Sequence, residues 1–316
     1  MADLSDDRGQ IILIAAFALA VTFIALALVV NAAIFTENLA SRGETAGSDD
    51  ALLLRHSVEQ SVGRAVTNAN TYNSSTEPAL NSSVATSVDN VSQAVTRQQS
   101  VSGRIVTVSG PAYTHGTRIV DNASGGSEFR GAASTDNWTV ATGVNARAYT
   151  MRIYDANTAG GANFGGTKTD EFRLNVTDGS DTWRVNVTEQ ASGDIAVGVR
   201  EFGGESGVCT ASPTGGPVDI DLTGGRVGGE PCAPLAFGEG VGSGYDIEYN
   251  NSHLVSGNYS LVVDQDEYTN GNLTSGIGTD DPGTRHGIYA VTVTYRYDGS
   301  SITYETEVRV APGEPA

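Results

Sequence analysis

The sequence predicts one N-terminal transmembrane helix and an α+β ectodomain dominated by antiparallel, sandwich-like β-structure. Residues 11–30 form a single uncharged apolar run. From about residue 103, apolar and polar residues instead alternate over short stretches that turn residues separate. Between these parts, apolar residues recur twice at helical spacing, so two short helices are expected after the anchor.

The apolar run is long enough to cross a membrane. About 20 residues at 1.5 Å per residue span a hydrocarbon core of about 30 Å. We expect a cytoplasmic leader over 1–9 and a transmembrane helix over 10–35. A cleaved secretory signal ending near residue 32 is the alternative, although the run exceeds the usual signal core of about 7–15 residues.

The residues before the run, Asp7-Arg8-Gly9-Gln10-Ile11, form a recognisable motif. It resembles the prepilin-peptidase site of archaeal type IV pilin-like and archaellin-like proteins. The resemblance implies cleavage between Gly9 and Gln10, and a helix that stays in the membrane or packs with like helices. Ile14 stands where bacterial pilins carry Glu, which favours an accessory component over a major filament subunit. The chain also looks like a group of haloarchaeal surface proteins that share this N-terminus.

The charge is strongly negative and is distributed along the chain. The formal net charge is −19, and Lys168 is the one lysine among 18 basic residues. Nucleic acid is therefore excluded as a partner, because binding it requires clustered Lys and Arg. Dispersed acid with almost no lysine is typical of a halophilic protein, whose self-repulsion concentrated salt screens. An ordinary acidic surface protein is the alternative.

Asn-x-Ser/Thr sequons occur only after the apolar run. Such acceptors are used at exposed positions of exported proteins, so they place the body outside the cell as a glycoprotein. Chance occurrence in a chain rich in Ser, Thr and Asn is the alternative. The ten sequon residues are Asn73, Asn81, Asn90, Asn122, Asn137, Asn175, Asn186, Asn250, Asn258 and Asn272.

The two cysteines, Cys209 and Cys232, lie in a Gly/Pro-rich stretch and in neither a CxxC nor a metal-ligand pattern. Outside the cell we expect a disulfide between them, worth about 3 kcal/mol. Two free thiols are the alternative.

The rest of the chain is divided by composition. Each helix of the expected hairpin has an apolar stripe. The stripe is formed by Leu54, Val58, Val62 and either Ala65 or Val66 in the first helix, and by Leu80, Val84, Val88, Val91 and Val95 in the second. A loop is expected between them at 68–79, and 201–244 is expected to be a long irregular excursion. The predicted segments are a polar linker (36–50), a helical hairpin segment (51–102), a β-rich extracellular domain (103–311) and a tail (312–316).

Two β-hairpins are predicted inside the β-rich domain. Residues 172–176 and 183–187 alternate around a turn at 178–181, which places Asn175 and Asn186 on the polar face. The second hairpin turns at 298–300. Its facing apolar sets are Tyr289, Val291, Val293, Tyr295 and Tyr297 on one strand and Ile302, Tyr304, Thr306, Val308 and Val310 on the other.

We predict no catalytic residue, cofactor or metal site. The four histidines (His56, His115, His253 and His286) form no HExxH motif, and no GxSxG, P-loop or dinucleotide fingerprint is present. The acidic cluster at 264–267 lacks the glycine and terminal glutamate of an EF-hand.

The expected function is therefore that of a non-enzymatic, membrane-anchored surface protein, as an accessory pilin-like component. Its expected partners are the lipid bilayer and like helices or pilus-assembly proteins. A membrane-tethered binding or adhesive module is an alternative. An exported hydrolase with paired carboxylates is a second, since such pairs need only be close in space.

Overall fold

A computed structural model of the chain describes residues 19–20, 22–23, 26–30, 49–123, 125–157, 171–200, 206–275, 282–300 and 302–315. The predicted leader, most of the predicted membrane helix and residues 36–48 of the predicted linker lie outside the described residues. Within the part that is described, no helix is both long and apolar enough to cross a membrane.

The helical hairpin is longer than the two short helices that the sequence predicts. Residues 49–72 are helical, so the first helix runs into the expected linker and the expected loop. The second helix, α2 (Glu77–Ser100), begins where the Thr76 side chain accepts a hydrogen bond from the Ala79 N–H. Pro78 occupies the first turn, where it displaces no helical hydrogen bond.

The described strands form two sheets. The first has the order β11-β10-β9-β4-β13-β1-β15-β14, with β16 beside β15 and β2 beside β13. Its members are β1 (Ile105–Asp121), β2 (Ser127–Glu128), β4 (Ala146–Ala156), β9 (Val218–Asp221), β10 (Arg226–Val227), β11 (Glu230–Pro231), β13 (Val255–Val263), β14 (Thr274–Ser275), β15 (Gly283–Asp298) and β16 (Thr303–Val310).

The second sheet has the order β3-β12-β5-β6-β7-β8. Its members are β3 (Trp138–Val144), β5 (Phe172–Thr177), β6 (Thr182–Glu189), β7 (Ile195–Arg200), β8 (Ser206–Ala211) and β12 (Tyr245–Asn250). The fold is therefore β-rich and mostly antiparallel, as predicted. The expected irregular excursion at 201–244 instead contributes the short strands β8 to β11 to the sheets.

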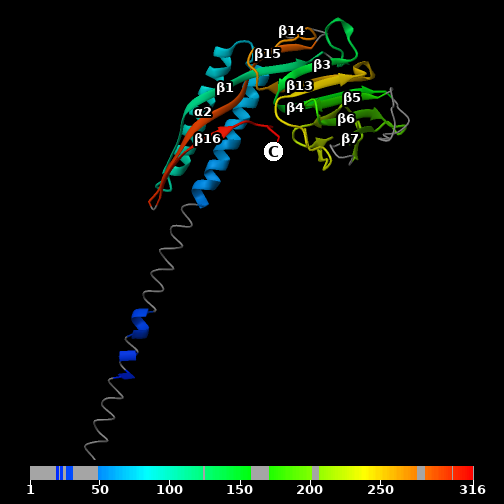
Figure 1. Cartoon of the computed structure of the whole chain (residues 1–316). Coiled ribbons are helices and arrows are strands. Elements are labelled where there is room, and N and C mark those ends of the chain that lie inside the picture. The colour runs from blue at the N-terminus through cyan, green and yellow to red at the C-terminus, as the bar shows by residue number, and fades with distance from the viewer. Residues whose placement is uncertain are drawn as a thin grey trace, which may run out of the picture.

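Two hydrophobic cores lie on different parts of the first sheet. The helical hairpin covers β1, β15 and β16, and the second sheet packs against the part of the first sheet that contains β4 and β13 (Figure 1). The long strand β1 takes part in both cores. Its Val106 and Val108 contact the helices, whereas Ile119 lies in the sandwich core.

Two bulges separate these parts of the β1–β15 pair. After the pair Ser109↔Thr294 the next pair is Ala112↔Thr292, so β1 has an extra residue there. Gly110 has φ +63°, which glycine adopts without steric cost. Further along, Thr114↔Ala290 is followed by His115↔Ile288, and the extra residue is Tyr289 of β15.

The second bulge changes one prediction for the last hairpin. The predicted facing sets do pair from Val291↔Val310 to Tyr297↔Tyr304, around the expected turn. Tyr289, however, packs with Val262 and Ala290, outside the core that contains Val291. The extra residue shifts the alternation by one position, and this depends on the pairing with a distant strand.

The outer edge of β1 is covered by hydroxyl groups of α2. Ser92 Oγ accepts a hydrogen bond from the Val108 N–H at 3.0 Å, and Thr96 Oγ1 donates to the Val106 carbonyl. Ser92 and Thr96 are four residues apart and therefore lie on one face of the helix. The helix thus satisfies polar groups of a strand edge, which would otherwise be open to another chain.

A buried polar contact joins the first helix to β15. The Asn70 side chain accepts from the Ile288 N–H (2.8 Å) and donates to the Ile288 carbonyl (3.0 Å). The fully buried Arg147 donates to the same carbonyl and, through Nη1, to the Pro312 carbonyl at 2.7 Å. The Gly313 carbonyl also accepts from the Ala148 N–H, so the expected tail is held against β4.

Replacing Asn70 tests how strongly this contact fixes the two parts together. In Asn70→Ala, the buried Ile288 N–H loses its partner, and each such loss costs about 1–3 kcal/mol. We expect the free energy of unfolding of the full chain to fall by that amount in urea. Asn68→Ala, an exposed position on the same helix, is the control and should change it by less than about 0.5 kcal/mol. Equal effects of the two substitutions would contradict the assignment.

Candidate functional site

The predicted processing residues, Gly9 and Gln10, lie outside the described residues. The predicted disulfide is present: Cys209 and Cys232 are bonded, with Cα atoms 6.0 Å apart. Cys209 lies in β8 at the edge of the second sheet, and Cys232 is buried in the sandwich core. The bond therefore fixes an edge strand to the segment that follows β11.

The sequon asparagines fall into two groups by exposure. Asn73, Asn90, Asn122 and Asn137 are exposed, and the other six are half-buried. Asn175 and Asn186 do lie on the face of β5 and β6 that points away from the core, as predicted, because their sequence neighbours carry the buried side chains.

The side-chain amides of two half-buried sequon residues donate hydrogen bonds within the fold. Asn186 Nδ2 donates to the buried Glu171 carboxylate at 2.9 Å. The Asn258 amide, oriented to satisfy its surroundings, donates to the carbonyls of Ala123 (3.0 Å) and Gly257 (2.9 Å). A sugar is attached through this same nitrogen, so the folded environments of these two residues oppose modification.

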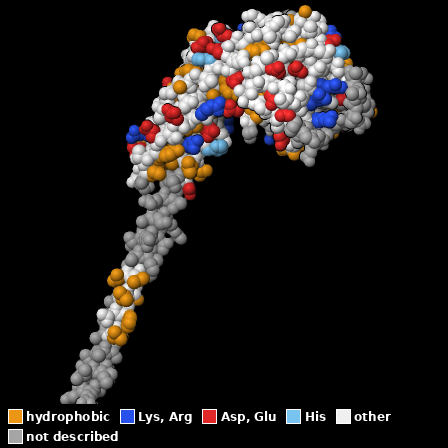
Figure 2. Space-filling view, viewed as in Figure 1, with side chains coloured by type: hydrophobic (Ala, Val, Ile, Leu, Met, Phe, Trp, Pro, Cys, Tyr) orange, Lys and Arg blue, Asp and Glu red, His pale blue; other side chains and the backbone are white. Residues whose placement is uncertain are grey.

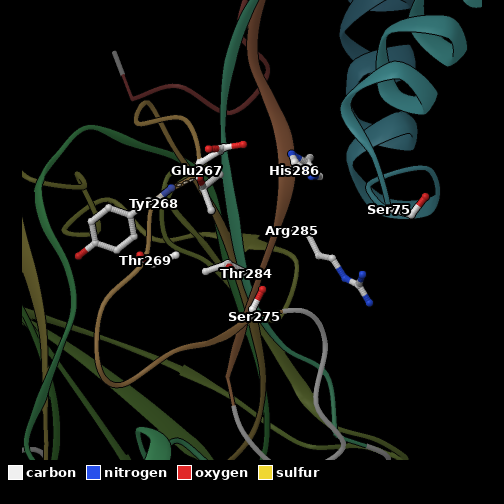
Figure 3. A pocket seen from close by; sticks show the side chains of 9 residues that line it. Ser75, Glu267, Tyr268, Thr269, Ser275, Thr284, Arg285 and His286 are labelled. Carbon is white, nitrogen blue, oxygen red and sulfur yellow. Dashed lines mark hydrogen bonds between the residues drawn. The ribbon is translucent and has the colours of Figure 1, made fainter.

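A polar cavity of about 440 Å³ lies at the junction of the helical hairpin and the sheets. Figure 3 shows Ser75 of the turn between the helices on one side and Glu267, Tyr268 and Thr269 on the other, with residues of β15 between them. The described lining residues are mostly hydroxyl-bearing or charged: Ser75, Thr117, Glu267, Tyr268, Thr269, Ser275, Thr284, Arg285 and His286. Such a lining suits a hydrated polar ligand more than an apolar one.

Two arginines stand at paired positions of β1 and β15, and one of them, Arg285, lines this cavity. Arg118 of β1 pairs with Arg285 of β15 across the strands, and Arg118 Nε donates to Ser260 Oγ at 2.9 Å. Burial lowers the pKa of Arg118, and the adjacent charge of Arg285 lowers it further. Positive charge is thus concentrated beside the cavity, and Glu267 is the carboxylate among its described lining residues.

Close to this cavity, three residues from separate parts of the chain bring metal-binding atoms together. Glu77 of α2, His115 of β1 and Asp266 of the loop after β13 each offer one such atom, and these atoms lie within 4.8 Å of one another. His115 Nε2 is 3.4 Å from Glu77 Oε1 and 3.0 Å from Asn81 Oδ1. We refer to Glu77, Asn81, His115 and Asp266 as the His115 cluster.

The sequence pattern does not single out His115 or Asp266, because the histidine is in no HExxH motif and the acidic cluster at 264–267 lacks the glycine and terminal glutamate of an EF-hand. The partners of His115 do not follow the short spacing of a linear metal-binding motif, because one side of the cluster comes from a helix before β1 in the sequence and the other from a loop after it. The i, i+4 placement of Glu77 and Asn81 on one helical face was the one local signal available.

The described residues of the N-terminal apolar run are helical, and their large apolar side chains are exposed. The exposed fractions are between 49% and 66% for Leu19, Phe23, Leu26, Leu28, Val29 and Val30. Figure 2 shows this apolar surface set apart from the head, where acidic and basic side chains are interspersed. Exposed apolar patches on proteins are commonly sites of protein–protein or membrane interaction.

The fold and these sites define a β-sandwich protein with a helical hairpin on one sheet. Residues 5–155 match a family of unknown function, DUF7261, and this match covers slightly less than half of the chain. No curated protein and no solved structure matched the chain.

The disulfide should contribute measurably to stability. Replacing both cysteines with serine releases a loop whose ends are 23 residues apart, and we expect the free energy of unfolding to fall by about 3 kcal/mol. Urea unfolding of the oxidised full chain measures this loss, and thiol titration before reduction should detect no free thiol. Thr210→Ala, an exposed neighbour on β8, is the control. An unchanged midpoint in the double variant would contradict the expectation.

Proposed function

We propose that the chain is a single-pass cell-surface protein, held in the membrane by its N-terminal helix and carrying a glycosylated β-rich head outside. The observation that carries this proposal is the exposed apolar surface of the described helical residues between 19 and 30. Fully burying one side chain such as Leu or Phe is worth about 1.5–3 kcal/mol. A bilayer, or a bundle of like helices, would supply the environment that the chain itself does not.

Features of the head support an extracytoplasmic location. The exposed sequon residues all lie beyond the apolar run, and the Cys209–Cys232 disulfide suits an oxidising compartment. The scarcity of lysine and the net charge of −19 support a role in concentrated salt. These properties agree with a head that is exported and exposed.

The Asp7-Arg8-Gly9-Gln10 motif supports the more specific role of an accessory component of a type IV pilus-like system. Processing after Gly9 would release the apolar helix from its charged leader. The helix could then leave the bilayer and pack with like helices. Ile14 in place of a glutamate favours the accessory role over that of a main subunit.

Cleavage at the leader is the first test. We expect the mature protein from its native membrane fraction to begin at Gln10, as measured by mass spectrometry of the N-terminal peptide. Gly9→Val should leave the leader attached, because a branched side chain would obstruct the cleavage position. Gly43→Val, beyond the apolar run, is the control and should be processed normally. A wild-type chain that retains residues 1–9 would rule out the pilin-like role and leave membrane anchoring to be judged by fractionation.

Glycan occupancy is the second test. We expect higher occupancy at the exposed residues Asn90 and Asn137 than at Asn186 and Asn258, whose amide nitrogens are engaged within the fold. Glycopeptide mass spectrometry of the natively produced protein measures this. Asn90→Gln should lower the mass of the protein by that of one glycan and leave the free energy of unfolding nearly unchanged. Asn186→Gln should lower the free energy of unfolding but should not remove a glycan. Unmodified sequons throughout would contradict the glycoprotein proposal.

A further inference from the structure

We propose that the His115 cluster binds a divalent transition-metal cation of the Mn²⁺ to Zn²⁺ class. The cluster presents one imidazole nitrogen, two carboxylates and one amide oxygen, from α2, β1 and the loop after β13. Imidazole is a ligand for transition metals, and carboxylate and amide oxygens complete the mixed coordination that this class accepts.

The distances agree with ligands arranged around one ion. Metal–ligand bonds of about 2.1 Å place adjacent ligand atoms about 3.0–3.4 Å apart and opposite ones about 4.2 Å apart. His115 Nε2 lies 3.0 Å from Asn81 Oδ1 and 3.4 Å from Glu77 Oε1. All of the Glu77, His115 and Asp266 atoms lie within 4.8 Å of one another. The exposed Asp266 side chain therefore has to approach by at most about 0.6 Å to stand opposite another ligand, or by at most about 1.8 Å to stand beside one, which rotation of its own side chain supplies.

The backbone positions of the ligands are already fixed by other contacts. Thr117 Oγ1 donates to the Gln265 carbonyl at 2.8 Å and accepts from the Tyr268 N–H at 2.7 Å, so the loop is held on both sides of Asp266. Tyr113 of the same strand donates to the Asn81 carbonyl at 3.0 Å, which holds α2 against β1. Metal binding would therefore cost little conformational entropy of the backbone, because these segments are already ordered.

The local charge favours a cation. Two carboxylates face His115, whereas the positive end of the α2 dipole opposes a cation with only about half a charge.

An ion at this position would tie the turn of the helical hairpin to the loop that borders the junction cavity. It would add a link between the helices and the head on the same side of β1 as the cavity residues Ser75 and Glu267. The ion would also use the oxygen of Asn81, which gives this sequon residue a role within the fold.

Metal titration of the full chain tests the proposal. The chelator-treated protein is titrated with ZnCl₂ by calorimetry and with CoCl₂ by absorption, both in excess MgCl₂ to occupy the general acidic surface. We expect one site, a change in the visible d–d bands of Co²⁺ when protein ligands replace its water, and a higher melting temperature with Zn²⁺. His115→Ala and Asp266→Asn should each weaken Zn²⁺ binding at least about tenfold, because losing even an outer-shell partner of a metal ligand costs about 10–100-fold in affinity.

A second histidine–carboxylate pair supplies the matched control. His253 Nδ1 lies 3.4 Å from Asp136, but Arg130 binds that carboxylate at 3.0 Å. His253→Ala should leave Zn²⁺ binding unchanged. Asp266→Asn lies on an exposed loop, so its effect does not depend on refolding of the core. Wild-type chain that shows no Zn²⁺ site, or binding that survives both His115→Ala and Asp266→Asn, would overturn the proposal.

Discussion

The contact of Asn70 and Arg147 with Ile288 is the constraint on which the relation of helices to head depends. Beyond β1, the β15 edge pairs with β14 at Gly283 and Thr284 and with β16 from Val291 onward. Ile288 lies in the gap between these partners. Asn70 and Arg147 satisfy its backbone there, so a helix side chain takes the place of a strand. This arrangement sets where the turn of the hairpin lies, and with it the junction cavity.

Local patterns predicted those parts of the fold that local physics determines. The β5–β6 and β15–β16 hairpins follow from period-two alternation around turn residues, and their observed pairing agrees. Tyr289 departs from its pattern because the bulge arises from pairing with a strand far away in the sequence. Asn70 lies in the Asn/Ser-rich stretch that is predicted to be a loop, but it is helical and its side chain bonds to the backbone of Ile288.

Some candidate sites are visible as sequence motifs, whereas others form only in the folded chain. A sequon or a cysteine pair is visible in the sequence, and the disulfide between Cys209 and Cys232 was predicted correctly. Whether an amide nitrogen is available is a tertiary property, as the contact between Asn186 and Glu171 illustrates. The His115 cluster has no linear signature, because β1 lies between the two segments that supply its partners and only the folded sheet brings them together.

The two cores leave part of the described apolar surface of the helices outside the packed interior. The helix-side core is closed by the inner faces of the hairpin, with Val58, Val62 and Val84 among its fully buried residues. The outward-facing Leu52 and Leu53 and the described apolar residues between 19 and 30 stay exposed. This surface belongs to neither core. If the chain is anchored as we propose, lipid or like helices would bury these side chains, and the anchor would change its surroundings without disturbing the packing of the head.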